Sequence, residues 1–82
     1  MELDYHQLGI LTREEIIFQL HDFIEMAVAS GETHVRIVTG KGKVVRPLVQ
    51  FELRKIKMVK SFEFADYFNG QDGAIEVELS II

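Results

Sequence analysis

The segment between Val35 and Pro47 constrains the fold most, because it changes from a strand pattern to a helix pattern within a few residues. Val35 to Val38 is rich in β-branched residues, and Gly40 and Gly42 follow it one residue apart. An amphipathic pattern then opens with Pro47 in its first turn, a position where proline is tolerated. Together these features predict a strand, a tight turn and the N-terminus of a helix.

The predicted turn has the chemistry of an anion site. Glycine lets the backbone approach a ligand closely, and the free N–H groups at the start of a helix favour negative charge. Lys41, Lys43 and Arg46 add positive charge at the same place. We therefore expect a phosphate site here, with the phosphate of a nucleic-acid backbone as its ligand. The alternative is a tight connection that binds nothing.

The basic residues are concentrated around this turn. The chain has a net charge of −4, yet eight of its nine Lys and Arg residues lie between positions 36 and 60, where Glu52 is the only acid. Eight bases against one acid give that segment +7, and one base against twelve acids gives the rest −11. Such asymmetry is typical of a protein with one anion-facing surface. The alternative, a helix face that is merely solvated, applies most to Arg54, Lys55 and Lys57.

Length and composition limit the class of protein. With 82 residues we expect one domain, spanning residues 1–82. The absence of cysteine excludes disulfides and a thiolate zinc site, and an apolar content of 48% argues against a disordered chain. No run of about 18 apolar residues occurs and the N-terminus is acidic. We therefore expect neither a membrane span nor a signal peptide, and a cytoplasmic location.

The first half of the chain shows a strand and then a helix. Residues 2–6 alternate as in a strand, with Leu3 and Tyr5 on its buried side. Thr12 and Glu15 form a capping box that starts the helix, and a Ser-Gly pair at 30–31 ends it.

The second half contributes three strands and another helix. Strands are expected at 34–39, 59–64 and 74–79. The second helix lies between the first two of these, with apolar positions Val45, Leu48, Val49, Phe51, Leu53 and Ile56. The order is β-α-β-α-β-β. The first two strands should be parallel, because a helix connects them in a right-handed crossover.

Several short segments can now be compared together: Leu3-Asp4-Tyr5-His6, Thr39-Gly40-Lys41-Gly42, Arg46-Pro47, Val59-Lys60-Ser61-Phe62 and Gly73-Ala74-Ile75-Glu76-Val77. In this order and spacing they resemble the Smr (small MutS-related) domain, whose signatures are L-D-x-H-G near the start and H/T-G-K/R-G after the second strand. The resemblance runs from Leu3 to Leu79. It implies an α/β (α+β) two-layer sandwich like the C-terminal domain of translation initiation factor 3, with a mixed four-stranded sheet and two helices on one face.

The resemblance also implies a role with nucleic acid. Smr domains are known as DNA-nicking or RNA-cleaving endonucleases, as parts of mismatch-related and recombination-limiting proteins, and as ribosome-associated factors that cleave messenger RNA. This sequence departs from the family pattern at two positions. Gln7 replaces the glycine after the histidine, and Thr39 stands where many members have a second histidine.

Asp4, His6 and Lys41 are the candidate catalytic residues. Cleavage of a phosphodiester needs a base, an acid and positive charge around the transition state. His6 is the candidate base or acid, because histidine is the side chain that titrates near neutral pH. Asp4 is a candidate to orient His6 or to hold a divalent ion. His21 and His34 are expected to be surface residues.

The candidate phosphate-binding residues are Thr39, Gly40, Lys41, Gly42, Lys43 and Arg46. With RNA, His6 could activate the neighbouring 2′-hydroxyl without a metal, whereas with DNA a water activated by Mg²⁺ or Mn²⁺ is the expected nucleophile. The sequence does not choose between these routes, and it assigns no metal ligands.

Three functions are compatible with these residues. The first is an endonuclease acting on RNA or DNA, and the second is a module that docks nucleic acid or a ribosome and cleaves nothing. The third is a protein-interaction domain that uses the acidic surface of the first helix, which predicts no salt-sensitive affinity for nucleic acid. The strand type, the sequence preference and the oligomeric state are left open.

Overall fold

The computed structural model describes residues 1–9, 11–40, 44–64 and 73–80. Its elements in chain order are β1 (Glu2–Asp4), the short 3-10 helix η1 (Tyr5–Leu8), α1 (Arg13–Ala29), β2 (His34–Val38), α2 (Val45–Leu53), β3 (Val59–Phe64) and β4 (Ala74–Leu79).

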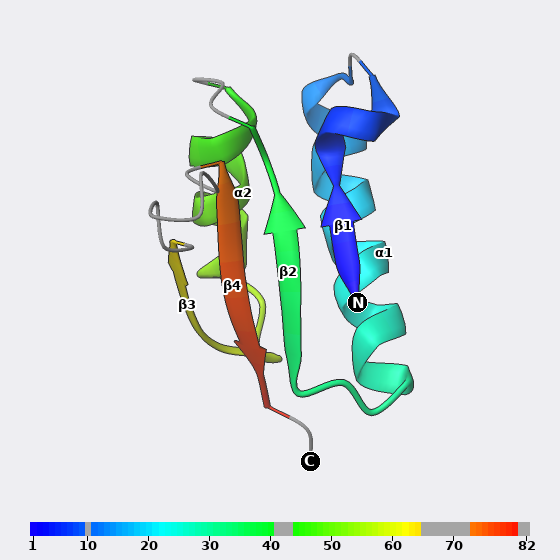
Figure 1. Cartoon of the computed structure of the whole chain (residues 1–82), viewed down its shortest axis with the longest axis vertical. Helices are drawn as coiled ribbons and strands as arrows, with labels where there is room; N and C mark the ends of the chain where they lie inside the picture. The colour runs from blue at the N-terminus through cyan, green and yellow to red at the C-terminus, as the bar shows by residue number, and fades with distance from the viewer. Residues whose placement is uncertain (10, 41–43, 65–72, 81–82) are drawn as a thin grey trace.

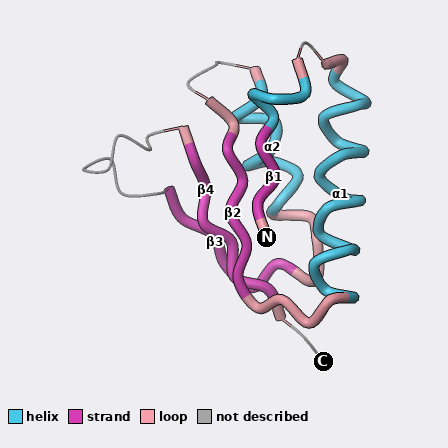
Figure 2. The backbone as a smooth tube through the Cα atoms, turned by 45° about the vertical axis from the view of Figure 1, so that its right-hand side comes forward, coloured by secondary structure: helices cyan, strands magenta, loops and turns pink. Residues whose placement is uncertain are grey.

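The four strands form one sheet in the order β1-β2-β4-β3 (Figure 1). β1 runs parallel to β2, whereas β4 runs antiparallel to both β2 and β3. Both helices lie against the same face of this sheet (Figure 2). The predicted mixed four-stranded sheet with two helices on one face is therefore confirmed.

The core lies between the helices and the sheet. α1 buries Ile16, Leu20, Phe23, Ile24 and Ala27, and α2 buries Leu48, Val49 and Leu53. These side chains recur at helical spacing, so each helix presents one apolar face to the inward side chains of β2 and β4. Among the described helices, none has the length and apolar character needed to cross a bilayer.

The start of α1 is the predicted capping box. The Thr12 hydroxyl accepts the Glu15 N–H at 3.2 Å, and the Glu15 carboxylate accepts the Thr12 N–H at 2.9 Å. These bonds satisfy backbone donors that a helix N-terminus leaves free. They also lower the pKa of Glu15, because they favour its charged form.

The first strand is shorter than the sequence pattern predicts. It ends at Asp4, and residues 5–8 turn into η1 instead of continuing the strand to His6. Two bonds hold this turn. The Asp4 carboxylate accepts the His6 N–H at 2.9 Å, and the Tyr5 hydroxyl donates to the Ile16 carbonyl at 2.8 Å. Tyr5 is still buried, as expected, and its burial raises the pKa of the phenol.

The second helix also differs from expectation. Its apolar residues Leu48, Val49, Leu53 and Ile56 are buried, although the helix itself ends at Leu53. Phe51, which the pattern placed among the same apolar positions, is 53% exposed. The sequence pattern could not separate this side chain from the buried ones, because its exposure depends on where α1 crosses α2.

Candidate functional site

The candidate site lies at the carboxyl ends of β1 and β2. The two strands are parallel, with Asp4 opposite Val38 at the last pair of their register. The segments that follow them therefore leave the sheet at the same edge, where ligands of α/β sheets commonly bind. The start of α2 lies at this same end of the molecule (Figure 1).

The turn after β2 brings Gly40 against the His6 side chain. A Cβ atom built on Gly40 would lie 3.5 Å from Cδ2 and 3.8 Å from Nε2 of the exposed His6 imidazole. Gly40 also has a φ of +76°, a conformation that side chains other than glycine rarely adopt. Glycine at this position thus lets the backbone turn directly beside the ring.

Asp4 contacts His6 through the backbone. Its Oδ1 accepts the His6 N–H, so the carboxylate caps η1 and holds the segment that carries the imidazole. Asp4 is half-buried. Within the described ranges, no three or more His, Cys, Asp or Glu side chains gather closely enough to hold a metal ion.

Thr39 turns its side chain away from the solvent. It is only 5% exposed, and its hydroxyl donates to the carbonyl of Gly73 at 2.9 Å and to that of Gly40 at 3.1 Å. The backbone N–H groups of Thr39 and Gly40 donate to the same Gly73 oxygen at 2.7 and 3.0 Å. The hydroxyl hydrogen is therefore used inside the protein, and the phosphate-binding role of Thr39 stays a prediction.

Gly73 is a site residue that the sequence pattern did not single out. A Cβ atom on Gly73 would lie 2.8 Å from both the carbonyl carbon and the Cα of Gly40, a distance that real Cβ atoms essentially never show. The sequence signal was present, since Gly73 begins the last strand segment of the family comparison.

The structure describes only some of the other predicted phosphate ligands. Lys41, Gly42 and Lys43 lie outside the described residues. Arg46 lies in the first turn of α2, with its guanidinium 4.1 Å from the centroid of the Phe64 ring. The N-cap of α2 makes no side-chain hydrogen bond, and the first turn holds no acidic residue. The start of this helix is therefore chemically suited to an anion.

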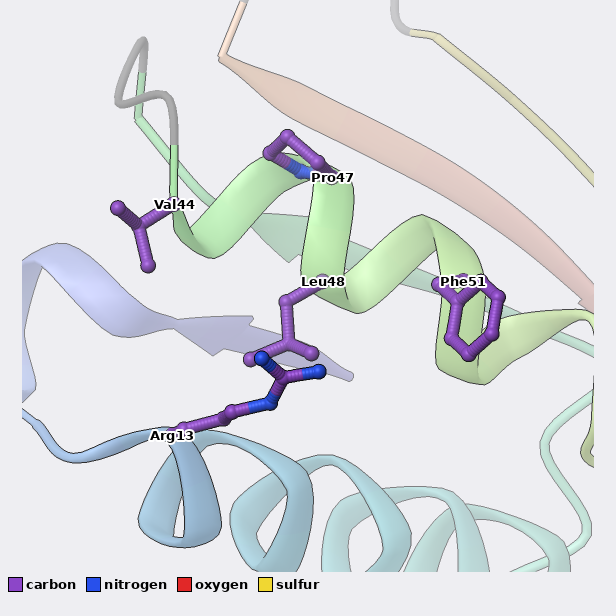
Figure 3. A pocket seen from close by; sticks show the side chains of 5 residues that line it. All are labelled: Arg13, Val44, Pro47, Leu48 and Phe51. Atoms are coloured by element: carbon purple, nitrogen blue, oxygen red, sulfur yellow. The ribbon is translucent and has the colours of Figure 1, made fainter.

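An apolar groove begins beside the N-cap of α2 and runs between the two helices. It has a volume of about 380 Å³ and is lined by Arg13, Val44, Pro47, Leu48 and Phe51 (Figure 3). Four of these residues belong to α2 or its cap, and Arg13 reaches across from the start of α1.

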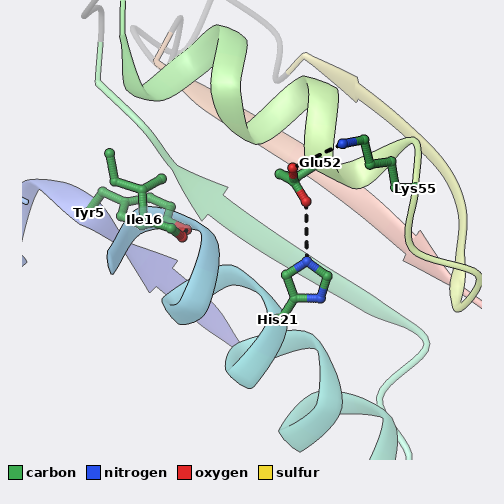
Figure 4. Close-up of polar contacts among 5 residues, drawn as sticks. All are labelled: Tyr5, Ile16, His21, Glu52 and Lys55. Atoms are coloured by element: carbon green, nitrogen blue, oxygen red, sulfur yellow. Dashed lines mark hydrogen bonds and ion pairs between the residues drawn. The ribbon is translucent and has the colours of Figure 1, made fainter. Parts of the chain in front are cut away.

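A charged cluster joins the two helices (Figure 4). His21 Nε2 on α1 lies 3.3 Å from Glu52 Oε2 on α2, and Lys55 Nζ lies 3.5 Å from Glu52 Oε1. The hydrogen bond from His21 lowers the pKa of Glu52, and Lys55 adds to the effect. His21 is half-exposed, so it is a surface residue as expected, but it also bonds to the neighbouring helix.

A comparison with protein families shows which family this sequence matches. Residues 3–80 match the family model of the Smr domain. The chain belongs to the Smr domain family. This result confirms the resemblance of the quoted segments, and the Smr match includes every candidate site residue.

Curated relatives of this Smr domain are much longer proteins named Endonuclease MutS2. The chain is 34% identical over 80 residues to the one from Carboxydothermus hydrogenoformans, covering 96% of the chain and 10% of that protein. It is 39% identical over 67 residues to the one from Acetivibrio thermocellus, covering 80% of the chain and 8% of that protein. The chain thus spans about a tenth of the length of the curated relatives it matches.

Solved structures of Smr domains share the fold. The Smr domain of Thermus thermophilus MutS2 is 31% identical, with a TM-score of 0.81 over 98% of this chain and 95% of that one. YdaL, a stand-alone small MutS-related protein from Escherichia coli, is 29% identical, with a TM-score of 0.81 over 95% of this chain and 63% of that one.

Proposed function

We propose that this Smr domain binds nucleic acid at the carboxyl ends of β1 and β2 and cleaves its phosphodiester backbone. The observation that carries the proposal is the imidazole of His6 lying against the Gly40 turn, at the end of the molecule where α2 begins. A proton-transfer group and a helix start suited to an anion then lie at one end of the molecule. The names of the MutS2 relatives support an endonuclease.

Each residue has a role in this proposal. His6 takes the proton of the attacking hydroxyl, and the N–H groups at the start of α2 bind the phosphate together with Arg46. Asp4 positions His6 through the bond to its N–H. Lys41 and Lys43 contribute charge on the strength of the sequence pattern alone.

RNA is the substrate that these residues suit best. The 2′-hydroxyl of RNA supplies an internal nucleophile. His6 takes its proton, the 2′-oxygen bonds to phosphorus to give a 2′,3′-cyclic phosphate, and the leaving 5′-oxygen takes a proton from solvent. With a DNA substrate, Asp4 would be the side chain that holds Mg²⁺ or Mn²⁺, and the ion would supply an activated water as nucleophile. The cytoplasm is the compartment that we propose for this activity.

A docking module that does not cleave is the second candidate. The buried hydroxyl of Thr39 is bonded to Gly73, and the family's second histidine is missing here. His6 is thus the single imidazole among the described residues at this edge, which favours binding without an acid–base pair. In that case the partner is nucleic acid, free or within a ribosome.

The test compares wild type with His6→Ala on labelled single-stranded RNA, single-stranded DNA and duplex DNA, with and without Mg²⁺ or Mn²⁺. We expect cleavage of RNA without metal, and a loss of at least about 100-fold in His6→Ala, the lower end for a general base. Binding should be retained in the variant and should weaken steeply as salt rises. Products would be separated on gels, and binding followed by fluorescence anisotropy.

Two further variants sharpen this test. His34→Ala removes an exposed histidine from the opposite end of β2 and should cleave like wild type. Asp4→Asn keeps an oxygen that can accept the His6 N–H, so it should retain most of the activity. Salt-dependent binding without products would establish the docking module, and an absence of salt-dependent binding would remove nucleic acid as the partner.

A further inference from the structure

The groove between α1 and α2 exposes an apolar stripe that the fold does not cover. Val44, Pro47, Leu48 and Phe51 follow the i, i+3, i+4, i+7 spacing of one helix face. Leu48 forms the buried floor, whereas Val44 is 69% exposed and Phe51 is 53% exposed. Leaving large apolar side chains in water is unfavourable, and their alignment along one groove indicates a binding surface.

The groove carries positive charge at its rim. The Arg13 guanidinium points across the gap toward Leu48 (Figure 3), and it makes no ion pair with any residue that the structure describes. Lys55 Nζ lies 4.3 Å from the centroid of the Phe51 ring. Arg13 and Phe51 thus place a cation and an aromatic ring at one apolar slot, a combination that proteins use to bind single-stranded nucleic acid.

Of these two cations, Lys55 is offset by Glu52, whereas Arg13 makes no ion pair with a described acid. The Glu15 carboxylate is bonded to the Thr12 N–H, and the Glu52 carboxylate contacts His21 and Lys55. Arg13 therefore remains available to an anionic partner, and the groove is complementary to a ligand that combines an apolar ring with negative charge.

The groove is also continuous with the proposed site and has a suitable size. Its first lining residue, Val44, is the N-cap of α2. A strand whose phosphate lies at the start of α2 would have a neighbouring base beside Val44. The volume of about 380 Å³ is near the lower end of ligand pockets, so it suits one flat ring system better than a whole helix of a protein partner.

We propose that this groove holds one unpaired base of a single-stranded nucleic acid, stacked on Phe51, with Arg13 bound to an adjacent phosphate. The inference rests on the proposed function, because it extends the binding site from the His6 edge along α2. It makes the substrate single-stranded, since a base paired in a duplex cannot leave its stack without cost.

The experiment measures affinity by fluorescence anisotropy for a short single-stranded RNA and for the same strand with abasic positions. Wild type should prefer the strand with bases, and Phe51→Ala should weaken binding of that strand at least about fivefold while leaving the abasic strand unchanged. Phe18→Ala is the matched control, because Phe18 is 65% exposed on α1 and does not line the groove. Arg13→Gln should weaken the binding of both strands, and by a larger factor than Arg54→Gln.

The outcomes separate this inference from the proposed function. Equal effects of Phe51→Ala and Phe18→Ala, or equal affinity of wild type for the two strands, would overturn the base-binding groove while the His6 site stands. The same equal effects or equal affinities would be expected if the groove instead binds a segment of a protein. If wild type bound neither strand, both proposals would fail. Circular dichroism would verify that each variant is folded.

Discussion

At the scale of single residues, the carbonyl oxygen of Gly73 holds the backbone of the candidate site. It accepts the N–H groups of Thr39 and Gly40 and the hydroxyl of Thr39. The missing side chain of Gly73 lets its backbone pack directly on Gly40. Because Gly40 in turn lies against His6, the position of the imidazole depends on a residue near the other end of the chain.

Gly73→Ala should therefore disturb both stability and activity. The added methyl group would lie 2.8 Å from the Gly40 backbone, and overpacking of this kind costs about 1–3 kcal/mol of unfolding free energy. We expect a lower midpoint in urea and a loss of RNA cleavage, because the Gly40 turn beside His6 must shift to make room for the methyl group.

Thr39→Val serves as the milder companion to this variant. It removes the hydroxyl bond but leaves both backbone N–H groups bonded to Gly73, so the loss should be about 1 kcal/mol. Wild-type stability in Gly73→Ala would show that the close packing of Gly73 on Gly40 is not needed.

At the scale of elements, the contact between α1 and α2 includes one charge that is nearly buried. Glu52 is 9% exposed and is held between His21 and Lys55. Its two partners are about half exposed, so solvent screens the pair and its contribution is at most about 1 kcal/mol.

Glu52→Gln should lower the stability of the domain in a pH-dependent way. The folded state lowers the pKa of Glu52 below 4.5, chiefly through the hydrogen bond from His21. A lowered carboxyl pKa stabilises the fold above the unfolded pKa, and this stabilisation is lost as the pH falls through the folded value. Urea unfolding should therefore separate wild type from the variant at pH 7, and much less at pH values well below 4.5.

Glu25→Gln is the matched control for this titration. Glu25 is an exposed glutamate on α1 and makes no ion pair within the described part of the chain. Its replacement should leave stability unchanged at either pH. A constant difference between wild type and Glu52→Gln across the acid range would contradict the assignment to Glu52 ionisation.

For the whole molecule, the open face of the sheet is acidic, whereas the helix side carries charges of both signs. Side chains alternate along a strand, so the sheet face away from the helices carries Glu2, Arg36, Glu76 and Glu78. Contacts from His34, Arg36 and Lys60 partly neutralise the acids of this face. Arg46 of α2 and Arg13 lie on the helix side beside the acids of α1, and we expect nucleic acid to bind close to these two cations.

Removing a charge from each surface should have unequal effects on nucleic-acid affinity. Arg46→Gln should weaken binding. It should also make the plot of log affinity against log salt less steep, by the amount expected for about one lost phosphate contact. Glu78→Gln should change affinity by less than about twofold at physiological salt, where the screening length is about 8 Å. Glu78 on β4 lies opposite His34 on β2. His34 is four residues, or about 13 Å along the strand, from Val38, where β2 reaches the candidate site.

This comparison would be made in one salt series with both variants. Equal and opposite changes in affinity would mean that only net charge matters, and not where the strand lies. A larger effect of Glu78→Gln would move the binding surface to the open face of the sheet.

Elements that depend on neighbouring residues were predictable from the sequence. The capping box of Thr12 and Glu15, the helical period of the two helices and the connection of two parallel strands through a helix are all encoded within short segments. For that reason the element order was predictable, and the ordered motifs gave the resemblance to the Smr domain, which implied the mixed sheet. The same motifs also indicated His6 and Gly40 as candidate site residues.

Contacts between distant segments were not predictable from the sequence. Thr39 and Gly73 are 34 residues apart, and their bond depends on the register of β2 against β4. The early end of β1 depends in part on the bond from Tyr5 to Ile16, and the exposure of Phe51 on the crossing of the two helices. Local patterns carry no information on such contacts, because hydrogen bonds and packing between distant residues form only once the chain is folded.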